Sequence, residues 1–525
     1  MNILGIGGIL GDAATALLHD GRLVAAMEEV KIARRARRGE LPLESIEACL
    51  QIAGLGAEQI DLVAVVRPLP PAAVPVLNLA LRSRFPNARL IFVEHHLAHA
   101  ASAFYASPFE SATVMTLDRF GDLRCGARWH GDGDKLTLDA DVYFPDSLGD
   151  LYSRVTELLG FTANADEHKT QWLSAQGDDR YLPLFRDILR AGPSGLPAID
   201  RAYFDAGHVT RGGFSQKFWE ALGIAGDAPL DAAVKPHIAA GLQRAIEQVV
   251  IALAGDARHV CLAGGLAFNA MLVAALEQHA PFEGVFVQPA AGNSGTALGA
   301  VLHAWHAVAH QAERVAIGAY CLGPEYDAEQ IKQVLENCKL RFRFLLTSDE
   351  VIETAVARLS ESKIVAWMQG RMEFGPRALG NRSLLASPLD PYSTENLNVF
   401  IKRREGFRKF AASVPAEIAH EYFEAGANAR FLASMGRVKP AYAKQFAAAV
   451  LSGDLVRVHA VAREDNPLYW RLLHEAGKRT GLPVLYNTSF NLFGEPLVCS
   501  PRDAVRSFYS SGIDSMLVGN FLLDK

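Results

Sequence analysis

The sequence predicts an α/β protein built from two domains. Short apolar runs, typical of buried strands, alternate along the chain with stretches of helical spacing, and this alternation favours the α/β class. Up to Met27 the chain reads as strand, glycine-rich loop, strand, Asp-Gly turn and strand. A chain of 525 residues is also too long for one hydrophobic core. We expect one domain over residues 1–345 and a second over residues 346–525.

The opening segment predicts the first half of an actin-like domain. Its strands are expected at Ile3 to Gly7, Ala14 to Leu18 and Leu23 to Met27. Strands joined by a glycine-rich turn and then by an Asp-Gly turn are typical of nucleotide-binding actin-like folds. Asp12 ends the glycine-rich turn, where an acidic residue either orients a nucleotide-bound metal or caps the turn.

The alternation of elements continues through the first domain. Helical spacing covers residues 42–52, and strands are expected at residues 62–66, 90–93 and 112–117. Two later strands, Val260 to Leu262 and Val285 to Gln288, each run into a glycine-rich loop. Such loops present backbone N–H groups and a helix N-terminus to a phosphate or a ribose. We interpret them as a second half-domain, with Gly264, Gly265 and Asn269 after the first strand and Asn293 after the second.

A histidine pair marks a candidate metal site. His95 and His99 lie one turn apart on a helix expected to continue to Tyr105, so their rings can aim at one point. Capping or core histidines are the more frequent explanation of such spacing. The strand at residues 112–117 favours the metal interpretation, because it delivers Asp118 at its carboxyl end, where α/β sites collect.

A loop rich in arginine and glycine marks the second domain. Helical spacing over Val351 to Leu359 and a strand at Ile364 to Trp367 lead into GRMEFGPRALGNRS, residues 370–383. Guanidinium groups match phosphate oxygens two at a time, and glycines let the backbone approach a ligand. For a lone loop, pairing of the arginines with local carboxylates is the simpler interpretation. More cations follow here, so we predict an oxyanion cradle; they are Lys402, Arg403, Arg404 and Arg408.

Composition narrows the function classes. The net charge of −6 argues against a general binder of nucleic acid or of anionic membranes. The six cysteines form no CxxC pair, and so large a chain needs no disulfides, so they are interpreted as reduced thiols. No apolar segment approaches the roughly 20 residues that span a bilayer, and no basic signal peptide follows Met1. We expect a cytoplasmic protein without nucleic-acid or membrane partners.

Three long motifs resemble the C-terminal half of the NodU/CmcH-type O-carbamoyltransferases. They are residues 370–383, LNVFIKRREGFRKFAASV (Leu397 to Val414) and PVLYNTSFNLFGEPLVCSPRDA (Pro483 to Ala504), and the N-terminal half is similar to the same family. The resemblance implies a two-lobed, actin-like (TsaD-like) N-terminal domain and a YrdC-like C-terminal domain. It implies that carbamoyl phosphate and ATP form carbamoyl-adenylate, from which the carbamoyl group passes to a hydroxyl of a small-molecule natural product or sugar, as in antibiotic biosynthesis.

The resemblance also implies roles for individual residues. Asp12, Asp118, Arg377 and Lys402 are expected in catalysis, and His95, His99 and Asn293 are expected to bind a divalent metal, which the resemblance implies is iron. Magnesium is expected with ATP. The residues expected to contact substrate or nucleotide are Lys169, Gly264, Gly265, Asn269, Arg371, Arg382, Arg408, Asn487 and Ser489.

Among the departures of this chain from the family pattern, two in the first domain bear directly on catalysis and metal binding. Gly11 stands where the family has a histidine, a candidate base for the acceptor hydroxyl. A positioned base typically raises the reaction rate about 10²–10⁴-fold. Asp12, Asp118 or His168 would therefore have to replace the missing histidine. Asn293 stands where the family has an aspartate, and a neutral amide is a poorer ligand, so the metal should bind more weakly or be lost.

Two other functions stay open. One is a nucleotide-binding homologue that has lost the metal-assisted transfer step, favoured by Gly11 and Asn293 and opposed by the retained cations. The other is a tRNA-modifying carbamoyl or threonylcarbamoyl enzyme, disfavoured by an acidic chain without a broad basic face. The identity of the acceptor and the oligomeric state, a homodimer included, also stay open.

Overall fold

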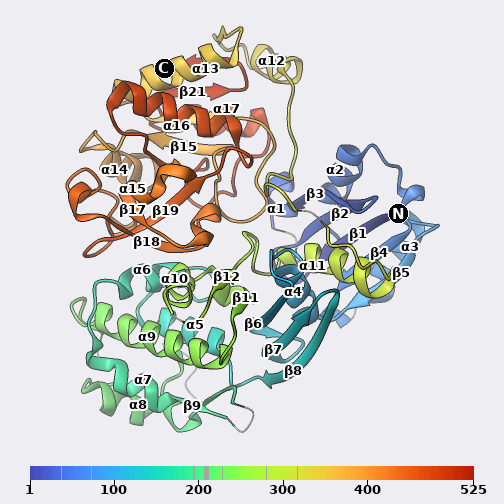
Figure 1. Ribbon diagram of the computed structural model, residues 1–525, viewed down its shortest axis with the longest axis vertical. Helices are drawn as coiled ribbons and strands as arrows, with labels where there is room; N and C mark the ends of the chain where they lie inside the picture. Colours follow the sequence, from blue (N-terminus) through green and yellow to red (C-terminus); the bar gives the residue numbers. More distant parts are fainter. Residues whose placement is uncertain are drawn as a thin grey trace.

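The β-strands of the protein form three large sheets that are covered by helices, as Figure 1 shows. The structure is a computed structural model that describes residues 1–36, 38–71, 74–192, 195–205, 212–226, 229–279, 281–315 and 317–525. The alternation of helices and strands along the chain confirms the α/β prediction.

The first sheet contains the predicted opening hairpins. Its strands are β1 (Asn2–Gly7), β2 (Ala14–His19), β3 (Arg22–Glu28), β4 (Leu62–Val66) and β5 (Arg89–Val93), in the order β3-β2-β1-β4-β5. Strand β1 is antiparallel to β2 and parallel to β4. The helices of this segment are α1 (Glu29–Ala33), α2 (Leu43–Ala53) and α3 (Val74–Arg84). All the strands and the helix predicted up to Val93 are confirmed.

The second sheet repeats this strand order. Its strands are β6 (Ser111–Gly121), β7 (Arg124–Asp132), β8 (Lys135–Tyr143), β11 (His259–Ala263) and β12 (Gly284–Phe286), in the order β12-β11-β6-β7-β8. In both sheets the first strand lies in the middle, with two antiparallel strands on one side and two parallel strands on the other. This repeat fits the two lobes of the predicted actin-like fold.

The helices that follow β5 are α4 (His95–Phe104), α5 (Leu148–Leu158), α6 (Glu167–Ser174), α7 (Leu182–Ile188), α8 (Gln216–Leu222), α9 (Lys235–Ala254), α10 (Ala270–Gln278) and α11 (Gly295–His303). Of these, α4 packs on the second sheet and α11 on the first. A small pair, β9 (Leu189–Ala191) and β10 (Pro197–Ile199), lies beside α7.

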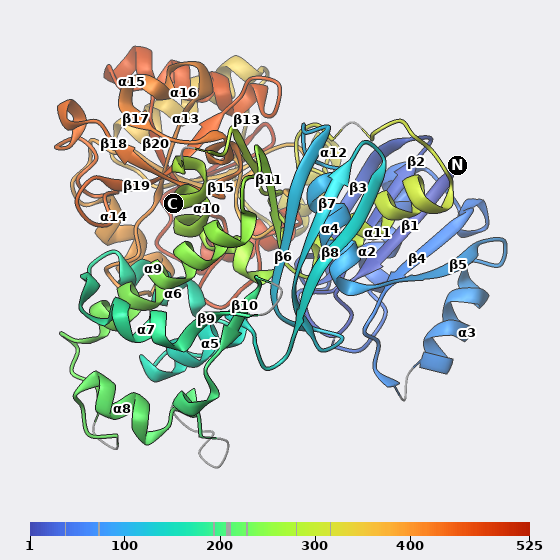
Figure 2. The same cartoon turned by 60° about the horizontal axis from the view of Figure 1, so that its bottom comes forward.

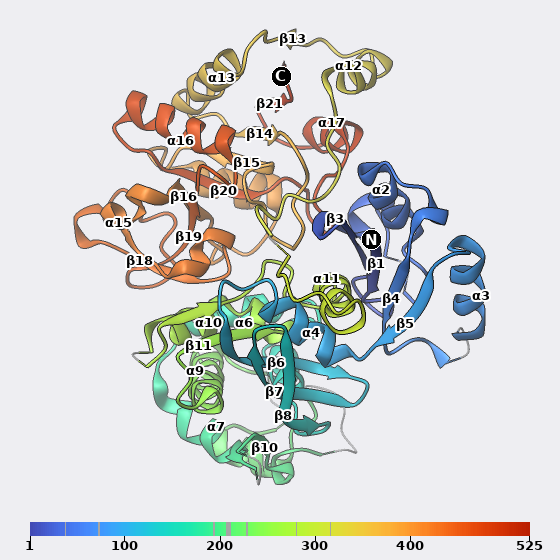
Figure 3. The same ribbon diagram turned by 45° about the vertical axis from the view of Figure 1, so that its right-hand side comes forward.

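Helices α4 and α11 connect the two lobes. Figure 3 shows α11 between α4 and β1, and the three elements contact one another in that order. Helix α11 approaches both α4 and β1 so closely that glycine is required at the contacts. A Cβ at Gly299 would lie 1.8 Å from the carbonyl oxygen of Ala98, and one at Gly5 would lie 2.2 Å from that of Ala297. These backbone contacts therefore set the distance between the loop at the end of β1 and the loop at the end of β6.

The third sheet is formed by the C-terminal residues. Its ten strands are, in spatial order, β13 (Arg343–Phe344), β22 (Phe521–Asp524), β21 (Ser515–Val518), β14 (Val365–Met368), β15 (Arg382–Ala386), β20 (Leu485–Ser489), β16 (Ala411–Pro415), β19 (Leu455–Val461), β18 (Met435–Val438) and β17 (Phe423–Glu424). Its helices are α12 (Ala328–Asn337), α13 (Ser348–Ser360), α14 (Ser393–Asn396), α15 (Ala419–Tyr422), α16 (Pro467–Thr480) and α17 (Pro501–Tyr509).

Both faces of β14, near the middle of this sheet, are buried. Alternate residues of β14 show it, because Ala366 lies in one hydrophobic core and Trp367 in another. Strands with two buried faces read as continuous apolar runs, which is how the sequence indicated β14. In the described residues we find no helix with both the length and the apolar character needed to cross a membrane.

A buried ion pair joins the first lobe to the C-terminal sheet. Lys31 of α1 lies 2.9 Å from a carboxylate oxygen of Glu28 and donates hydrogen bonds to the carbonyl oxygens of Glu373 and Gly375, at 2.9 and 2.6 Å. Glu28 accepts a hydrogen bond from the backbone N–H of Gly375. The arginine-rich loop is therefore anchored in the first lobe.

We predict that Lys31→Met strongly destabilises the protein. It leaves the buried Glu28 carboxylate without its cation, which typically costs about 3–5 kcal/mol. Scanning calorimetry should show a lower unfolding midpoint than that of Lys332→Met, which removes only the exposed 3.9 Å pair with Glu336. Equal midpoints for the two variants would contradict the anchoring role of Lys31.

Candidate functional site

The structure brings His95, His99 and Asp118 together at one point. The Nε2 atoms of His95 and His99 lie 3.0 and 3.2 Å from the same oxygen of Asp118 and 3.1 Å from each other. The Glu94 carboxylate caps α4 by accepting hydrogen bonds from His96 and Leu97, so the histidines occupy the first turns of the helix as predicted. Two imidazole nitrogens and one carboxylate oxygen within 4.8 Å of one another fit a divalent metal.

Asp118 lies at an irregularity in its strand. We expected the strand to end at Leu117, but β6 continues to Gly121 and its pairing with β7 shifts between these two residues. A bulge of this kind re-aims side chains and is common beside functional sites. Burial alone would raise the pKa of Asp118, but its hydrogen bonds to His95 and His99 hold that pKa well below its usual value. The carboxylate is therefore charged and available to a cation.

The second ring nitrogen of His99 and the neighbouring His96 differ in their surroundings. Burial and then the neighbouring His95 lower the pKa of His99, whose Nδ1 atom is buried without a hydrogen-bond partner among the described residues. His96 on the same turn bonds Thr116 at 2.9 Å and the carbonyl oxygen of Arg124 at 3.0 Å, and burial lowers its pKa to about 3. His96 is thus a neutral structural residue.

The predicted glycine loops border this cluster. A Cβ at Gly265 would lie 3.1 Å from Oδ1 of Asp118, and one at Gly264 would lie 2.2 Å from the carbonyl oxygen of Leu117. Both glycines therefore pass directly against the carboxyl end of the paired part of β6. Asn269, by contrast, is buried, caps α10 and exchanges hydrogen bonds with Gln243 on α9 at 2.8 and 3.1 Å.

The two departures from the family pattern lie side by side. A Cβ at Gly11 would lie 4.0 Å from Nδ2 of Asn293 and would meet nothing closer. The next residue, Asp12, is accessible to water, yet its pKa is raised by loss of solvation among the surrounding protein atoms and then by Glu28 and Asp118. The structure therefore gathers Gly11, Asp12 and Asn293 near the His95–Asp118 cluster.

A second cluster consists of arginines with few partners. Loss of solvation and then Arg408 lower the pKa of Arg377 to about 10, and loss of solvation followed by Arg377 and Arg408 lowers the pKa of Arg457. Among the described residues Arg377 has no hydrogen-bond acceptor, and Nε and Nη2 of the buried Arg457 have none either. We call Arg377, Arg408 and Arg457 the arginine cluster.

Neighbouring acids do not neutralise the arginine cluster. Arg408 approaches Glu405 only to 4.0 Å, whereas Lys169 of α6 holds Glu405 at 2.7 Å and Asp166 at 3.2 Å. His168 lies beside the cluster with its Nε2 atom buried and unpartnered in the described part of the chain. Such an excess of positive charge, with Arg457 buried and Arg377 and Arg408 half-buried, fits a bound anion.

The other arginines of the predicted cradle are bonded to the protein itself. Arg371 donates to the carbonyl oxygens of Gly323, Leu322 and Val24, and the fully buried Arg382 donates to those of Gln369, Gly370 and Pro324. The structure thus separates Arg371 and Arg382, which hold backbone together, from Arg377, which has free donors.

Glu373 shapes the loop that carries Arg377. One oxygen of its buried carboxylate accepts hydrogen bonds from the backbone N–H groups of Leu379, Asn381 and Arg382, at 2.9, 2.8 and 3.0 Å. Asn487 adds a bond from its side chain to the carbonyl oxygen of Ala378. These bonds fix the loop around the arginine without using its guanidinium.

Lys402 supports the segment after β20. Its buried ammonium donates to the carbonyl oxygens of Ser489 and Asn491, at 2.5 and 2.9 Å, and to the Asn491 side chain at 2.6 Å. Burial and then Arg404 and Arg408 lower its pKa. Lys402 and Ser489 therefore contact each other, next to the arginine cluster.

Sequence reasoning missed Arg457 and gave no role to Glu373. In the sequence, the only sign of Arg457 is a charge inside the apolar run of strand β19. In the structure its guanidinium lies 5.4 Å from the ring of Trp172 on α6.

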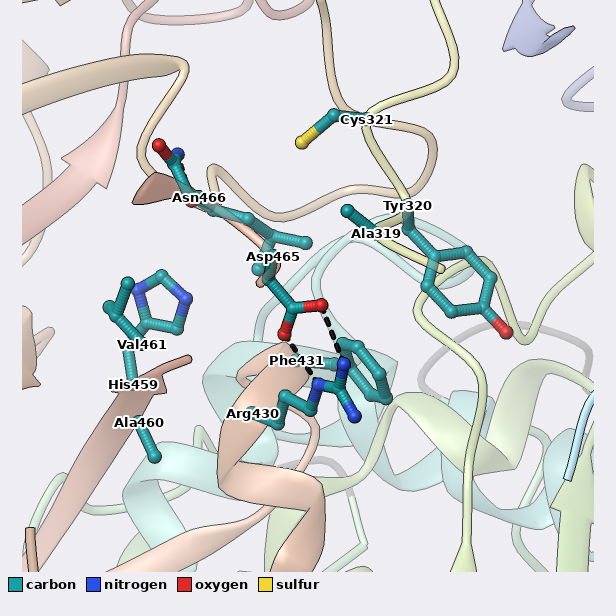
Figure 4. Close-up of a pocket in the computed structure, with 11 residues that line it drawn as sticks. Ala319, Tyr320, Cys321, Arg430, Phe431, His459, Ala460, Val461, Asp465 and Asn466 are labelled. Carbon is teal, nitrogen blue, oxygen red and sulfur yellow. Dashed lines mark hydrogen bonds and ion pairs between the residues drawn. The ribbon is translucent and has the colours of Figure 1, made fainter. Parts of the chain in front are cut away.

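Figure 4 shows a contrasting site, a pocket beside β19 where Arg430 forms a two-bond ion pair with Asp465, at 2.5 and 2.6 Å. That guanidinium is already neutralised, so the arginine cluster is the stronger candidate for an anion.

Family models and individual relatives match the chain along most of its length. Residues 72–302 match the model described as carbamoyltransferase N-terminus, and residues 356–525 match carbamoyltransferase C-terminus. An uncharacterized protein of Synechocystis is 33% identical over 100% of this chain and 97% of its own length. Nodulation protein NolO of Bradyrhizobium diazoefficiens is 35% identical over 82% of this chain and 79% of its own.

A search of solved structures gives more distant similarities. Component A of the (R)-2-hydroxyglutaryl-CoA dehydratase of Acidaminococcus fermentans is 18% identical, covers 59% of this chain and 99% of its own, and has a TM-score of 0.37. A score at that level supports no conclusion about shared architecture.

We predict that His168 makes the stability of the protein depend on pH. Burial and the nearby Arg408 and Arg377 lower its pKa from 6.5 to about 4, so between these pH values the unfolded state binds more protons than the folded state. The stability contribution is complete above pH 6.5 and is lost as the pH falls toward 4. In urea unfolding, His168→Gln should flatten this loss, and an unchanged slope would contradict the prediction.

Proposed function

Because this chain belongs to the carbamoyltransferase family, we propose that it is an O-carbamoyltransferase that works in two half-reactions. In the first, water cleaves carbamoyl phosphate to carbamate and phosphate, and a carbamate oxygen then attacks the α-phosphorus of ATP, so that carbamoyl-adenylate forms and pyrophosphate leaves. In the second, a hydroxyl of a small-molecule acceptor attacks the carbonyl carbon, its proton passes to a base, and AMP leaves. The division into residues 1–345 for transfer and 346–525, YrdC-like, for adenylate formation belongs to the same proposal.

The single observation that carries the first half-reaction is the arginine cluster. Two polyanions repel each other, so cations must hold them together and take up the charge that develops as phosphate groups leave. Arg377 and Arg457 have guanidinium donors without acceptors among the described residues, and Arg408 approaches Glu405 only to 4.0 Å, so the three can bind phosphate oxygens two at a time. Lys402 then acts as a positioning residue, because its donors hold the Ser489 and Asn491 carbonyls.

The second half-reaction is supported by the His95, His99 and Asp118 cluster. These residues would hold a divalent metal, with iron as our proposal, and such an ion, when bound, polarises a carbonyl oxygen. Asp12 is our candidate for the base, because its raised pKa brings it closer to that of a group that accepts a proton near neutral pH. Gly265 lies against Asp118, where a side chain would crowd the carboxylate, so we propose that its backbone faces the nucleotide.

A second candidate function is a nucleotide-binding homologue without transfer activity. It is favoured by Gly11 and Asn293, which lie together and together remove a histidine and an aspartate from the predicted site. The two candidates differ in their chemistry. Incubation of the full chain with carbamoyl phosphate and ATP, followed by mass spectrometry for carbamoyl-adenylate and by a pyrophosphate assay, separates them, since binding without product would rule out the transferase.

We predict that carbamoyl phosphate stabilises the protein through Arg457. A ligand at 100 times its Kd adds about 2.7 kcal/mol of stability, which calorimetry detects as a higher midpoint. Loss of charge-assisted hydrogen bonds in Arg457→Met should weaken binding by about 10- to 100-fold. The same variant should raise the midpoint of the ligand-free protein, because it removes a buried, unpaired charge.

Arg479→Met, at an exposed position in α16, serves as the matched control and should leave both midpoints unchanged. If carbamoyl phosphate stabilised Arg457→Met as well as the unchanged protein, the arginine cluster would not be the phosphate site.

We also predict that Gly11→His with Asn293→Asp strengthens metal binding. The backbone of Gly11 is outside the left-handed region and its added Cβ would meet only Asn293, so a side chain fits there. A carboxylate is a better ligand than an amide for a divalent transition metal. Metal analysis after dialysis against iron(II) should show higher occupancy in the double variant, and His99→Ala should abolish binding in both backgrounds. Equal occupancy would contradict the prediction.

A further inference from the structure

Helix α6 of the second lobe forms one side of the arginine cluster. Figure 2 shows this helix where the second lobe meets the C-terminal part of the chain. His168 and Trp172 are four residues apart on α6, so their side chains share one face of the helix. The Trp172 ring lies 5.4 Å from the Arg457 guanidinium. Arg408 and Arg377 act electrostatically on His168. This face of α6 is therefore turned toward all three arginines.

The neighbours of His168 fix the first turn of α6 on two sides. Glu167 accepts a hydrogen bond from the hydroxyl of Ser153 on α5, at 2.7 Å. Lys169 pairs with Glu405 of the C-terminal part, also at 2.7 Å. Because its two neighbours are anchored to different parts of the protein, the backbone of His168 is held at the boundary between them.

The His168 ring has a nitrogen without a partner. Its Nε2 atom is buried and has no hydrogen-bond partner in the described part of the chain. The structural residue His96 differs, since its ring nitrogens bond the Thr116 hydroxyl and the carbonyl oxygen of Arg124. A buried polar atom left without a partner costs stability, so its presence beside a charged cluster indicates a ligand.

The charges around His168 suit a base that works on a bound phosphate. Burial and then Arg408 and Arg377 lower the pKa of His168 from 6.5 to about 4, so its ring is uncharged near neutral pH and can accept a proton. A bound phosphate brings negative charge, which opposes the effect of the arginines and raises this pKa toward its ordinary value. His168 thus becomes a stronger base when the anion is present.

Only one nucleophile in the first half-reaction must lose a proton in order to react. A carbamate oxygen already carries negative charge when it attacks ATP, so that step is served by cations. Water has to give up a proton as it attacks carbamoyl phosphate. The nearby carboxylates Glu405 and Asp166 are weaker bases than His168, because Lys169 holds them at 2.7 and 3.2 Å.

We infer that His168 is the base that activates water for the cleavage of carbamoyl phosphate, an inference that rests on the proposed function. His168 then belongs to the first half-reaction and not to the acceptor hydroxyl. A residue of the first domain completes the site formed by arginines of the C-terminal domain.

The step balances without any further reactant. The water oxygen forms a bond to the carbonyl carbon while one of its protons passes to Nε2 of His168. The bond between that carbon and the phosphate oxygen breaks, and its electron pair stays on the phosphate. Nε2 then returns the proton to the phosphate, so the products are carbamic acid and hydrogen phosphate. Carbamic acid ionises to the carbamate that attacks ATP.

A bypass experiment on the full chain tests this role. The rate of carbamoyl-adenylate formation is measured by mass spectrometry with ATP and either carbamoyl phosphate or ammonium carbamate. His168→Gln should lower the rate from carbamoyl phosphate by about 10²–10⁴-fold. The same variant should keep the rate from carbamate within about threefold of that of the unchanged protein, which also shows that it is folded. His420→Gln, at an exposed position in α15, is the matched control and should leave both rates unchanged.

Chemical rescue gives a second readout that a structural role would not produce. Imidazole added to His168→Ala should restore turnover of carbamoyl phosphate, because it supplies the missing base, and should not restore turnover by Arg457→Met. If the unchanged protein accepts no external carbamate, the rescue decides alone.

Three results would overturn the role of His168: an equal loss of rate with both substrates, no loss with either, and no rescue by imidazole. The proposed function fails separately, when the unchanged protein forms carbamoyl-adenylate from neither substrate.

Discussion

The concentration of positive charge around Arg377, Arg408 and Arg457 is the constraint on which much of the architecture depends. Like charges brought out of water destabilise a fold unless a counter-charge arrives. Here the nearest carboxylates, Glu405 and Asp166, are held by Lys169. The surrounding structure compensates with backbone order: three N–H groups bind Glu373, and the guanidinium groups of Arg371 and Arg382 hold carbonyl oxygens in place. These internal hydrogen bonds fix the backbone around the cluster, while a few guanidinium donors of the cluster stay free.

The two candidate sites belong to different sheets but share connecting elements. Lys31 and Glu28 join the first lobe to the loop of Arg377, while Lys169 joins α6 of the second lobe to Glu405 of the C-terminal part. Asn428 adds a third connection, because it bonds Glu277 and the backbone of Val285 and Val287. A displacement of either lobe would disturb the arginine cluster, so the sites are mechanically linked through buried polar bonds.

Sequence reasoning found most of the elements because their signals are local. Strand β1, helix α4 and strand β14 follow from apolar runs and helical spacing, and each was predicted to within one or two residues. The pairing of His95 with Asp118 followed from the rule that α/β sites lie at strand ends. The sequence could not show which of the long side chains bond to the backbone and which keep their donors free for a ligand. Arg371, Arg377 and Arg382 are alike in the sequence, and only tertiary contacts show that the middle one has free donors.

The backbone contact of Gly299 with Ala98, and of Gly5 with Ala297, has an evolutionary consequence. The spacing between the two lobes depends on peptide groups, which every sequence shares, and not on the volumes of interchangeable side chains. Positions such as 11 and 293 can therefore be replaced without loosening the frame that holds their neighbours. Chemistry at this junction is free to diverge by substitution, whereas the glycines beneath it are expected to stay invariant in any descendant that keeps the fold.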